Sequence, residues 1–319
     1  MKIYRQQRMC VFSDLKSVEV MGLNRLIDIL NNGIVRTLVL ICLCMILVMT
    51  QVFFPHLYFS TANRRSGDFE VGIHYVYEQD STNQISTEVS RIHELGFSVI
   101  RVTLGYDPLN PESSRRTDAF YAATRSLGVD VSLIIPNHER SNTTRYYLNR
   151  WGENVAYIQI LNEPDSSQSW DAGALFTDDE IMSKFEEAYR LAEPYRPGVK
   201  LYTNFGPGFV VRSNLPVTMS EKLDFVGLDV FMESYLILSP HFVELLREST
   251  HKDVVITEFG MSTSDDAVQS DFIQRGLNLF KSMGLSGCWL TYWNSELDNY
   301  GIRGRLAERT VGEWIAQNT

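Results

Sequence analysis

The stretch VAYIQILNEPD, residues 155–165, is an apolar run of strand character that ends in a polar Asn-Glu-Pro step. A second run of the same kind, VVITEFG at residues 254–260, also carries a glutamate near its end. Glu163 and Glu258 are 95 residues apart (258 − 163), which is about three strand–helix units of roughly 30 residues each. Near-continuous apolar strands are typical of parallel sheets that are covered on both faces. The two stretches therefore predict strands four and seven of a fold built from repeating strand–helix units.

The rest of the chain from residue 68 onward alternates between short apolar runs and amphipathic segments. Strands are predicted at residues 68–76, 98–104, 130–136, 155–163, 200–205, 224–231, 254–258 and 287–293. Helices are predicted at residues 83–95, 117–127, 143–151, 178–192, 239–249, 265–283 and 311–316. Eight alternating units in about 250 residues fit an α/β fold, the (β/α)8 TIM barrel.

A doubly wound open sheet is the alternative for a chain of alternating strands and helices. That fold normally carries a glycine-rich phosphate turn after its first strand. The corresponding stretch here, IHYVYEQD at residues 73–80, contains no glycine. The pattern therefore favours a single closed barrel domain at residues 68–319.

The two glutamates end strands four and seven, and a (β/α)8 barrel forms its active site at the carboxyl ends of its strands. Both carboxyls are therefore expected at the same mouth of the barrel. A facing pair of carboxylic acids is what cleavage of a glycosidic bond requires. Glu163 would protonate the departing oxygen, Glu258 would attack the anomeric carbon, and the positive charge of Arg101 would keep Glu258 ionised. These residues predict a retaining glycosidase.

The segments NEP at 162–164 and ITEFG at 256–260 resemble the paired signatures of clan A retaining glycoside hydrolases. These are cellulase-like and mannanase-like (β/α)8 enzymes of family 5 or a related family, and the resemblance covers about residues 68–319. It implies that Glu163 is the acid/base and that Glu258 is the nucleophile, which forms a covalent glycosyl-enzyme intermediate in a double displacement.

Other positions match the family or depart from it. Arg101 resembles the family's second-strand arginine, and Trp293 resembles the eighth-strand tryptophan that floors the sugar subsite. Many clan members end strand six with a tyrosine that hydrogen-bonds the nucleophile, whereas this chain has Phe231 there. Tyr235 or Tyr292 is a candidate to replace that tyrosine.

Further polar and aromatic side chains near the strand ends are candidate contacts for the substrate, a β-linked polysaccharide or oligosaccharide. Asn162 would donate a hydrogen bond to the sugar 2-hydroxyl. The full set of predicted substrate-binding residues is Arg101, Asn162, His138, Asn137, Trp293, His74, Tyr235 and Trp170. Transglycosylation by the same residues and a non-catalytic carbohydrate-binding barrel are the alternatives. An acyl hydrolase lacks support because the chain has no Gly-x-Ser-x-Gly elbow.

The first 67 residues differ in composition from the body. Residues 1–36 form a basic arm, and residues 37–54 (TLVLICLCMILVMTQVFF) carry no charge. An 18-residue helix reaches about 27 Å, close to the thickness of a bilayer's hydrocarbon core. A buried core helix and a cleaved signal peptide are alternatives, although 36 residues before the apolar run are many for a signal peptide. We predict an uncleaved transmembrane signal-anchor, followed by a linker at residues 55–67.

Charge and cysteine content indicate where the catalytic domain lies and which partners and metal sites are not expected. The basic residues of the arm favour an N-terminus on the inside of the membrane, with the catalytic domain extracellular. The net charge of −10 argues against nucleic acid as a partner. Only Cys288 of the four cysteines lies in the body, so no disulfide is expected within it, and no Cys/His pattern indicates zinc. Neither a metal nor an organic cofactor is predicted, and the oligomeric state is left open.

Overall fold

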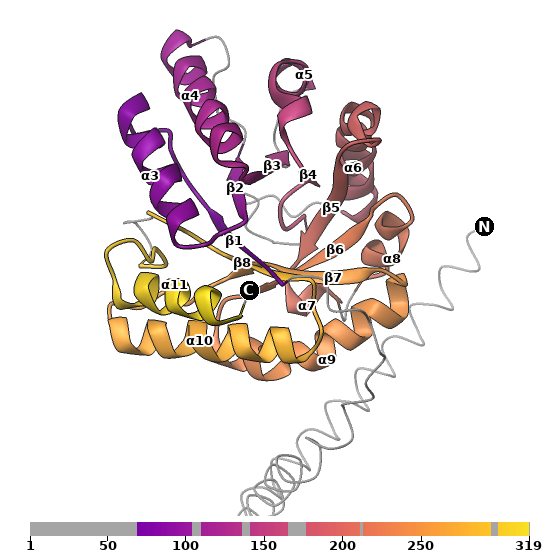
Figure 1. Cartoon of the computed structure of the whole chain (residues 1–319). Coiled ribbons are helices and arrows are strands. Elements are labelled where there is room, and N and C mark those ends of the chain that lie inside the picture. The colour runs from indigo at the N-terminus through magenta and orange to yellow at the C-terminus, as the bar shows by residue number, and fades with distance from the viewer. Residues whose placement is uncertain are drawn as a thin grey trace, which may run out of the picture. The chain divides into compact units, whose positions relative to one another are not determined.

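The computed structural model describes residues 69–103, 110–135, 141–164, 177–210, 213–294 and 299–318. Within these ranges, eight parallel strands each pair with the next along the chain, and β8 returns to β1 to close a barrel. The strands are β1 (Glu70–His74), β2 (Val99–Thr103), β3 (Asp130–Ile135), β4 (Tyr157–Ile160), β5 (Lys200–Phe205), β6 (Phe225–Val230), β7 (Asp253–Phe259) and β8 (Gly287–Leu290). Figure 1 shows helices around the outside of these strands. The predicted (β/α)8 barrel is confirmed, and an open doubly wound sheet is excluded.

Several of the helices begin directly after a residue whose side chain caps them. They are α3 (Thr82–Glu94), α4 (Pro111–Leu127), α5 (Ser141–Trp151), α6 (Asp178–Ala192), α7 (Pro207–Val210), α8 (Leu215–Ser220), α9 (Glu233–Thr250), α10 (Asp266–Ser282) and α11 (Leu306–Asn318), with 3-10 turns η2 (Gly152–Asn154) and η3 (Glu193–Tyr195). Ser81 and Thr177 each form a capping box, at α3 and α6 respectively. Such boxes satisfy two backbone donors that a helix start leaves without partners.

Several helix boundaries differ from the predicted ones. Helix α4 begins at Pro111, ahead of the predicted residue 117, because Asn110 caps it and proline suits the first turn. Helix α9 begins at Glu233 and continues through Pro240, although residue 239 was its predicted start. The short helices α7 and α8 after β5 were not predicted, since four to six residues are too few to show a helical period.

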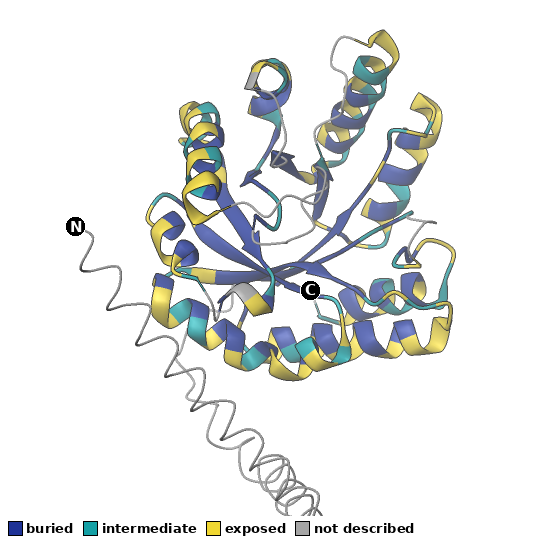
Figure 2. Ribbon diagram, turned by 180° about the vertical axis from the view of Figure 1, so that it is seen from behind, coloured by how far each residue is buried: buried dark blue, intermediate teal, exposed yellow. Residues whose placement is uncertain are grey.

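The core has two layers, one between strands and helices and one inside the barrel. Figure 2 shows the strands almost entirely buried and the helices buried on one side. The inner layer, here called the barrel floor, consists of Val99, Tyr157, Tyr202, Phe225, Val255 and Trp289. The Trp289 ring lies 5.3 Å from that of Tyr157 and 5.4 Å from that of Tyr202, between ring centroids. A Cβ on Gly72 would meet this indole at 2.5 Å, so a glycine on β1 leaves the room that Trp289 occupies.

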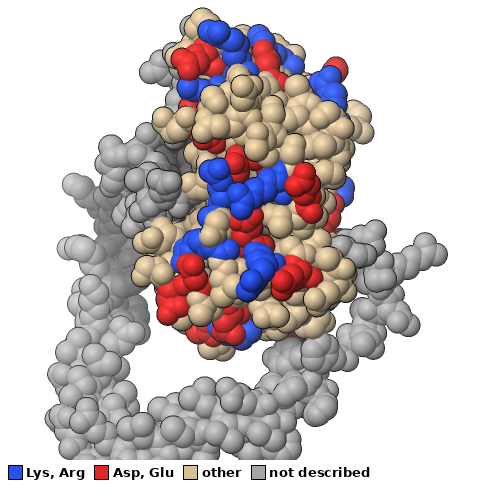
Figure 3. All heavy atoms as spheres, turned by 60° about the vertical axis from the view of Figure 1, so that its left-hand side comes forward, with Lys and Arg blue, Asp and Glu red and all other residues tan. Residues whose placement is uncertain are grey.

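Acidic and basic side chains lie side by side on the outer helices, as Figure 3 shows for one face. Arg91 of α3 pairs with Glu308 of α11 at 2.6 Å, and Arg275 of α10 pairs with Glu233 of α9 at 2.6 Å. An exposed pair such as Arg275–Glu233 contributes about 0–1 kcal/mol to stability, whereas Glu308 of the other pair is buried. Both pairs join neighbouring helices around the barrel, but the buried layers carry most of the stability.

Some predictions concern residues outside those that the structure describes. The basic arm at 1–36, the signal-anchor at 37–54 and the linker at 55–67 all lie there, so the signal-anchor stays a prediction. Among the described helices, none combines the length and the apolar character needed to cross a bilayer. Across the described residues, no group of three or more His, Cys, Asp or Glu side chains is arranged to hold a metal ion.

Candidate active site

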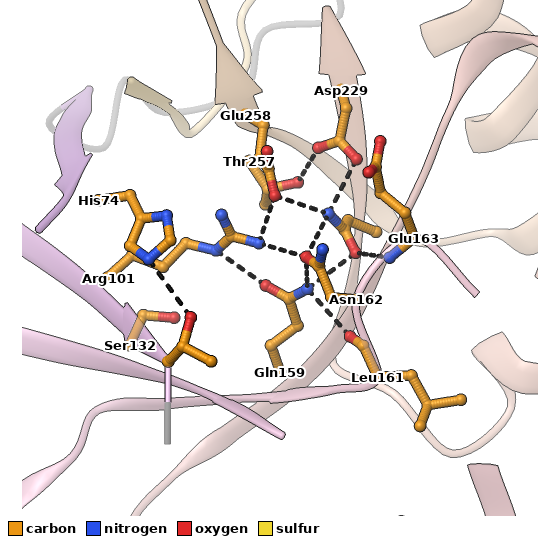
Figure 4. Close-up of polar contacts among 12 residues, drawn as sticks. His74, Arg101, Ser132, Gln159, Leu161, Asn162, Glu163, Asp229, Thr257 and Glu258 are labelled. Atoms are coloured by element: carbon orange, nitrogen blue, oxygen red, sulfur yellow. Dashed lines mark hydrogen bonds and ion pairs between the residues drawn. The ribbon is translucent and has the colours of Figure 1, made fainter. Parts of the chain in front are cut away.

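Two residues beyond the barrel floor, the barrel interior changes from aromatic to polar. Side chains on a strand alternate between its faces, so each floor residue has a neighbour two positions on that faces the same way. For Val99, Tyr157, Tyr202 and Val255 these neighbours are Arg101, Gln159, Asn204 and Thr257. All four are buried. Together with Asp229 and Glu258 they form the polar layer, which Figure 4 shows with Glu163 beside it.

An irregularity in β7 brings Glu258 into the polar layer. Leu228 of β6 pairs with Ile256, but the next residue, Asp229, pairs with Glu258, so β7 has one residue more than β6 over this stretch. Regular alternation would turn Thr257 and Glu258 to opposite faces of the strand. Such a bulge re-aims a side chain, and bulges are frequent next to active sites. Thr257 donates to Asp229 at 3.0 Å, while Glu258 reaches the guanidinium on β2.

Glu258 forms a buried ion pair with Arg101. Arg101 Nη2 lies 2.7 Å from Glu258 Oε1, and the two residues are only 1% and 7% exposed. Burial lowers the pKa of Arg101 and is the largest single cause, but Glu258, Tyr202 and Asp229 together outweigh it, so the pKa is raised overall. The guanidinium therefore stays charged, and the pairing predicted for these two residues is present. It gives the expected nucleophile a permanent positive partner.

Glu163 lies just beyond β4, where the chain leaves regular strand geometry. The prediction extended this strand to Glu163, but it ends at Ile160 because Leu161 has a φ of 65° and Glu163 a φ of 39°. Positive φ is uncommon for residues other than glycine, and such residues cluster at functional sites. The Glu163 main-chain N–H donates to Asn204 Oδ1 at 2.8 Å. The turn leaves Glu163 only partly buried, beside the polar layer.

The orientations of the amide side chains follow from partners whose roles are fixed. Arg101 Nε donates to Gln159 Oε1 at 2.9 Å, so Gln159 Nε2 faces the other way and donates to the Leu161 carbonyl at 2.9 Å. Arg101 Nη2 also donates to Asn162 Oδ1 at 2.7 Å. The Asn162 oxygen is therefore turned toward Arg101 and its Nδ2 away from it, which agrees with the predicted donor role toward a sugar hydroxyl.

Asp229 is a third carboxyl of the site, and sequence reasoning gave it no role. It lies between Glu258 and Glu163 in Figure 4 and accepts hydrogen bonds from Asn204 Nδ2 at 2.8 Å and Thr257 Oγ1 at 3.0 Å. Burial, followed by the charges of Glu258 and Glu163, raises the pKa of Asp229 well above its usual value. Asp229, Gln159, Asn204 and Thr257 were not predicted as site residues. The sequence does carry a signal for these residues, because each is a polar residue at an inward-facing position of an otherwise apolar strand.

His74, a predicted substrate contact, lies at the end of β1 beside this layer. Its ring stacks on Tyr292 with centroids 5.1 Å apart, and Nε2 lies 3.4 Å from Thr103 Oγ1. Burial, and then the charge of Arg101, lowers the pKa of His74 well below its usual value, so the imidazole is neutral. Its Nδ1 has no hydrogen-bond partner within the described part of the chain.

The predicted sugar-platform role of Trp293 does not fit the structure. Its side chain is 0% exposed and belongs to the core between strands and helices. The indole Nε1 donates to Glu88 Oε2 at 2.7 Å, and the Arg91 guanidinium lies 5.6 Å from the ring centroid. Strand β8 ends at Leu290, so the chain turns before Trp293 and directs it toward α3. A ring without an exposed face cannot stack on a sugar.

The aromatic residues considered for the missing strand-six tyrosine differ in what they contact. Tyr235 is partly buried and packs against the main core from the first turn of α9. Phe231, which stands where many clan members have a tyrosine, contacts the edge of Tyr300 with centroids 5.9 Å apart. Tyr292 is the ring that stacks on His74. Asn137, His138 and Trp170 lie outside the residues that the structure describes, so their predicted roles stay predictions.

Comparison with known proteins was made at the level of sequence and of structure. No protein-family model matches the chain, and no curated protein matches it by sequence. Solved structures do match. The endo-1,4-beta-mannanase from Rhizomucor miehei aligns with a TM-score of 0.61 at 14% identity, covering 78% of this chain and 95% of that chain.

Two further solved structures give the same result. The endo-beta-1,4-mannanase from Thermotoga petrophila aligns with a TM-score of 0.60 at 11% identity, covering 81% of this chain and 78% of that one. The beta-glucosidase from Thermotoga maritima in complex with cyclophellitol aligns with a TM-score of 0.54 at 14% identity, covering 74% and 86%. Identities this low show a shared fold. The chain therefore has the (β/α)8 barrel of proteins that are described as mannanases and as a β-glucosidase.

Proposed function

We propose that the chain is a retaining glycosidase that cleaves a β-linked glycan by double displacement. The observation that carries the proposal is the pair of glutamates at one barrel mouth, both joined to Asn204: Glu163 through its main-chain N–H and Glu258 through a 3.5 Å contact with Nδ2. The shared fold with mannanases and a β-glucosidase adds support. Retaining enzymes separate the two carboxyls by about 5–5.5 Å.

In the first step, a Glu258 carboxylate oxygen attacks the anomeric carbon and forms a carbon–oxygen bond. The glycosidic bond breaks, and its electron pair and the proton of Glu163 go to the departing sugar. In the second step, Glu163 removes a proton from water, which attacks the anomeric carbon and releases Glu258. A second sugar in place of water gives transglycosylation with the same residues. The Arg101 guanidinium, 2.7 Å from Glu258 Oε1, places a positive charge beside the attacking carboxylate.

The test uses the catalytic body with aryl β-mannosides, β-glucosides, β-galactosides and β-xylosides. Glu258→Ala is expected to lose nearly all turnover, and added azide should restore part of it with a product of inverted anomeric configuration, read by NMR. Glu163→Ala should slow release of poor leaving groups most. Wild-type rates in Glu258→Ala would show that the nucleophile is assigned wrongly, and no turnover of any glycoside by the wild type would contradict the function.

Anchoring in a membrane through residues 37–54, with the catalytic domain outside the cell, is a separate proposal. It rests on the uncharged apolar run and on the basic residues before it. A chain that begins at Ser66 is expected to be soluble and active, while the full chain should sediment with membranes. Loss of both solubility and activity in the shortened chain would instead show that the apolar run belongs to the fold.

A further inference from the structure

The Asn204 side chain contacts both proposed catalytic glutamates. It lies near the end of β5 and is 0% exposed. Its Oδ1 accepts from the Glu163 main-chain N–H and from Gln159 Nε2, both at 2.8 Å. Its Nδ2 donates to Asp229 Oδ2 at 2.8 Å and lies 3.5 Å from Glu258 Oε1. One buried amide therefore bridges β4, β6 and β7.

Chemistry allows the Asn204 amide only one orientation. The Glu163 main-chain N–H can only donate, so the atom facing it has to be the oxygen. The nitrogen then faces the Asp229 carboxyl. A flipped amide would set N–H against N–H on one side and oxygen against carboxyl oxygens on the other. Asp229 accepts from this nitrogen and anchors it, and is itself held by Thr257.

The backbone that Asn204 contacts is strained. Glu163 has a φ of 39°, in the left-handed region that favours glycine. A non-glycine residue persists there only when its surroundings over-determine its conformation. The hydrogen bond from Asn204 to the Glu163 N–H is one such constraint. The Glu163 carboxyl is attached to this backbone, so the hydrogen bond to Asn204 affects where Glu163 would deliver its proton.

We propose that Asn204 is a positioning residue that sets the carboxyl of Glu163 relative to Glu258, and that Asp229 acts through Asn204 by anchoring its amide nitrogen. The inference rests on the proposed glycosidase function, since it gives Asn204 a task only if Glu163 delivers a proton. Burial and the charge of Glu258 raise the pKa of Asp229, which agrees with a structural carboxyl rather than a second nucleophile.

A positioning role for the acid predicts a specific kinetic signature. A 2,4-dinitrophenyl leaving group departs without a proton, whereas a phenyl leaving group needs one. Asn204→Ala should therefore reduce kcat/KM for the phenyl glycoside far more than for the dinitrophenyl glycoside. General acid catalysis contributes about 100-fold to 10,000-fold, so a misplaced acid should cost about 30-fold or more on the phenyl substrate. The dinitrophenyl substrate should lose no more than about fivefold.

Two near-isosteric variants keep the test informative if Asn204→Ala fails to fold. Asn204→Asp keeps the acceptor for the Glu163 N–H but sets an oxygen against Asp229 and Glu258. Asp229→Asn keeps the shape but replaces the carboxyl that anchors the Asn204 nitrogen with a neutral amide. Both should increase the ratio between the two substrates. Thr203→Val is the matched control, because Thr203 lies on the same strand, faces the helices, and has a hydroxyl without a hydrogen-bond partner in the described residues.

The experiment measures kcat/KM on both aryl glycosides, of the sugar that the wild type accepts, for the wild type and the four variants. Thermal unfolding midpoints are compared alongside. An increased ratio in Asn204→Asp and Asp229→Asn, with Thr203→Val unchanged, supports the inference. Equal losses on both substrates, or an unchanged ratio, would overturn it while the function stands. A wild type inactive on every glycoside would instead remove the proposed function, and this inference would fall with it.

Discussion

The barrel floor and the polar layer are built on the same strands, two residues apart, yet different interactions hold them together. The floor packs Trp289 among Tyr157, Tyr202 and Phe225, and apolar packing generally tolerates changes that conserve volume. The polar layer is a network of hydrogen bonds around one guanidinium, in which each group fixes the orientation of the next. Losing a partner there leaves a buried polar atom without compensation. The floor therefore contributes stability through packing, whereas the polar layer also fixes the geometry of the site.

The largest effect that separates the two layers is expected from Arg101→Met. This change leaves Glu258 buried without its positive partner, and it also removes donors to Gln159 and Asn162. Breaking a buried ion pair costs about 3–5 kcal/mol of unfolding free energy. We expect that loss together with complete loss of turnover, measured by chemical denaturation and by aryl glycoside hydrolysis. Retention of activity would show that the polar layer does not control the nucleophile.

A matched pair of glycine substitutions compares the layers directly. A Cβ on Gly72 would lie 2.5 Å from Trp289 in the floor, and one on Gly227 would lie 2.4 Å from Thr257 Oγ1 in the polar layer. Each alanine should destabilise the protein by about 1–3 kcal/mol through overpacking. Gly227→Ala should also reduce kcat/KM at least about tenfold, whereas folded Gly72→Ala should retain most activity. Similar losses of activity in both variants would contradict the division between the layers.

The pH dependence of stability tests the polar layer alone. The pKa of Asp229 is raised in the folded state, so its protonated form favours folding. Its contribution is complete below the unfolded pKa of about 3.9 and declines as pH rises toward the folded pKa, by at most about 1.4 kcal/mol per pH unit. Asp229→Asn should thus gain stability relative to the wild type as pH rises from 4 to 8. Urea unfolding of both proteins measures this, and parallel curves would refute it.

The smallest effect is expected at Tyr202, which joins the two layers. Its ring packs on Phe225 with centroids 4.7 Å apart, while its hydroxyl donates to Gln159 Oε1 at 2.8 Å. Tyr202→Phe keeps the packing and removes the hydrogen bond, which should cost about 0.5–1.5 kcal/mol. We expect kcat to fall less than about threefold, because Arg101 still orients Gln159. A larger kinetic effect than in Gly227→Ala would show that the layers are not separable.

Much of the barrel could be predicted because strands and helices leave local signals. The apolar runs that became β6 and β7 were predicted within a few residues, and the helix predicted at residues 178–192 is α6. The short helices α7 and α8 were missed because local periodicity does not reach significance in so few residues. Trp293 was assigned to the sugar by its resemblance to the family's eighth-strand tryptophan, but β8 ends at Leu290 and the Trp293 side chain contacts Glu88 instead.

The sequence by itself determined the repeating strand–helix order, the polar residues at inward-facing strand positions, and the two glutamates near the ends of their strands. Those are properties of residues within about ten positions of one another. Only the tertiary structure decided that Thr257 and Glu258 both enter the barrel, because the bulge exists in the pairing of β7 with its neighbours. It also decided that Asn204 bridges Glu163 to Asp229. These contacts join strands 25 or more residues apart, and no local pattern encodes which side chains will meet when the barrel closes.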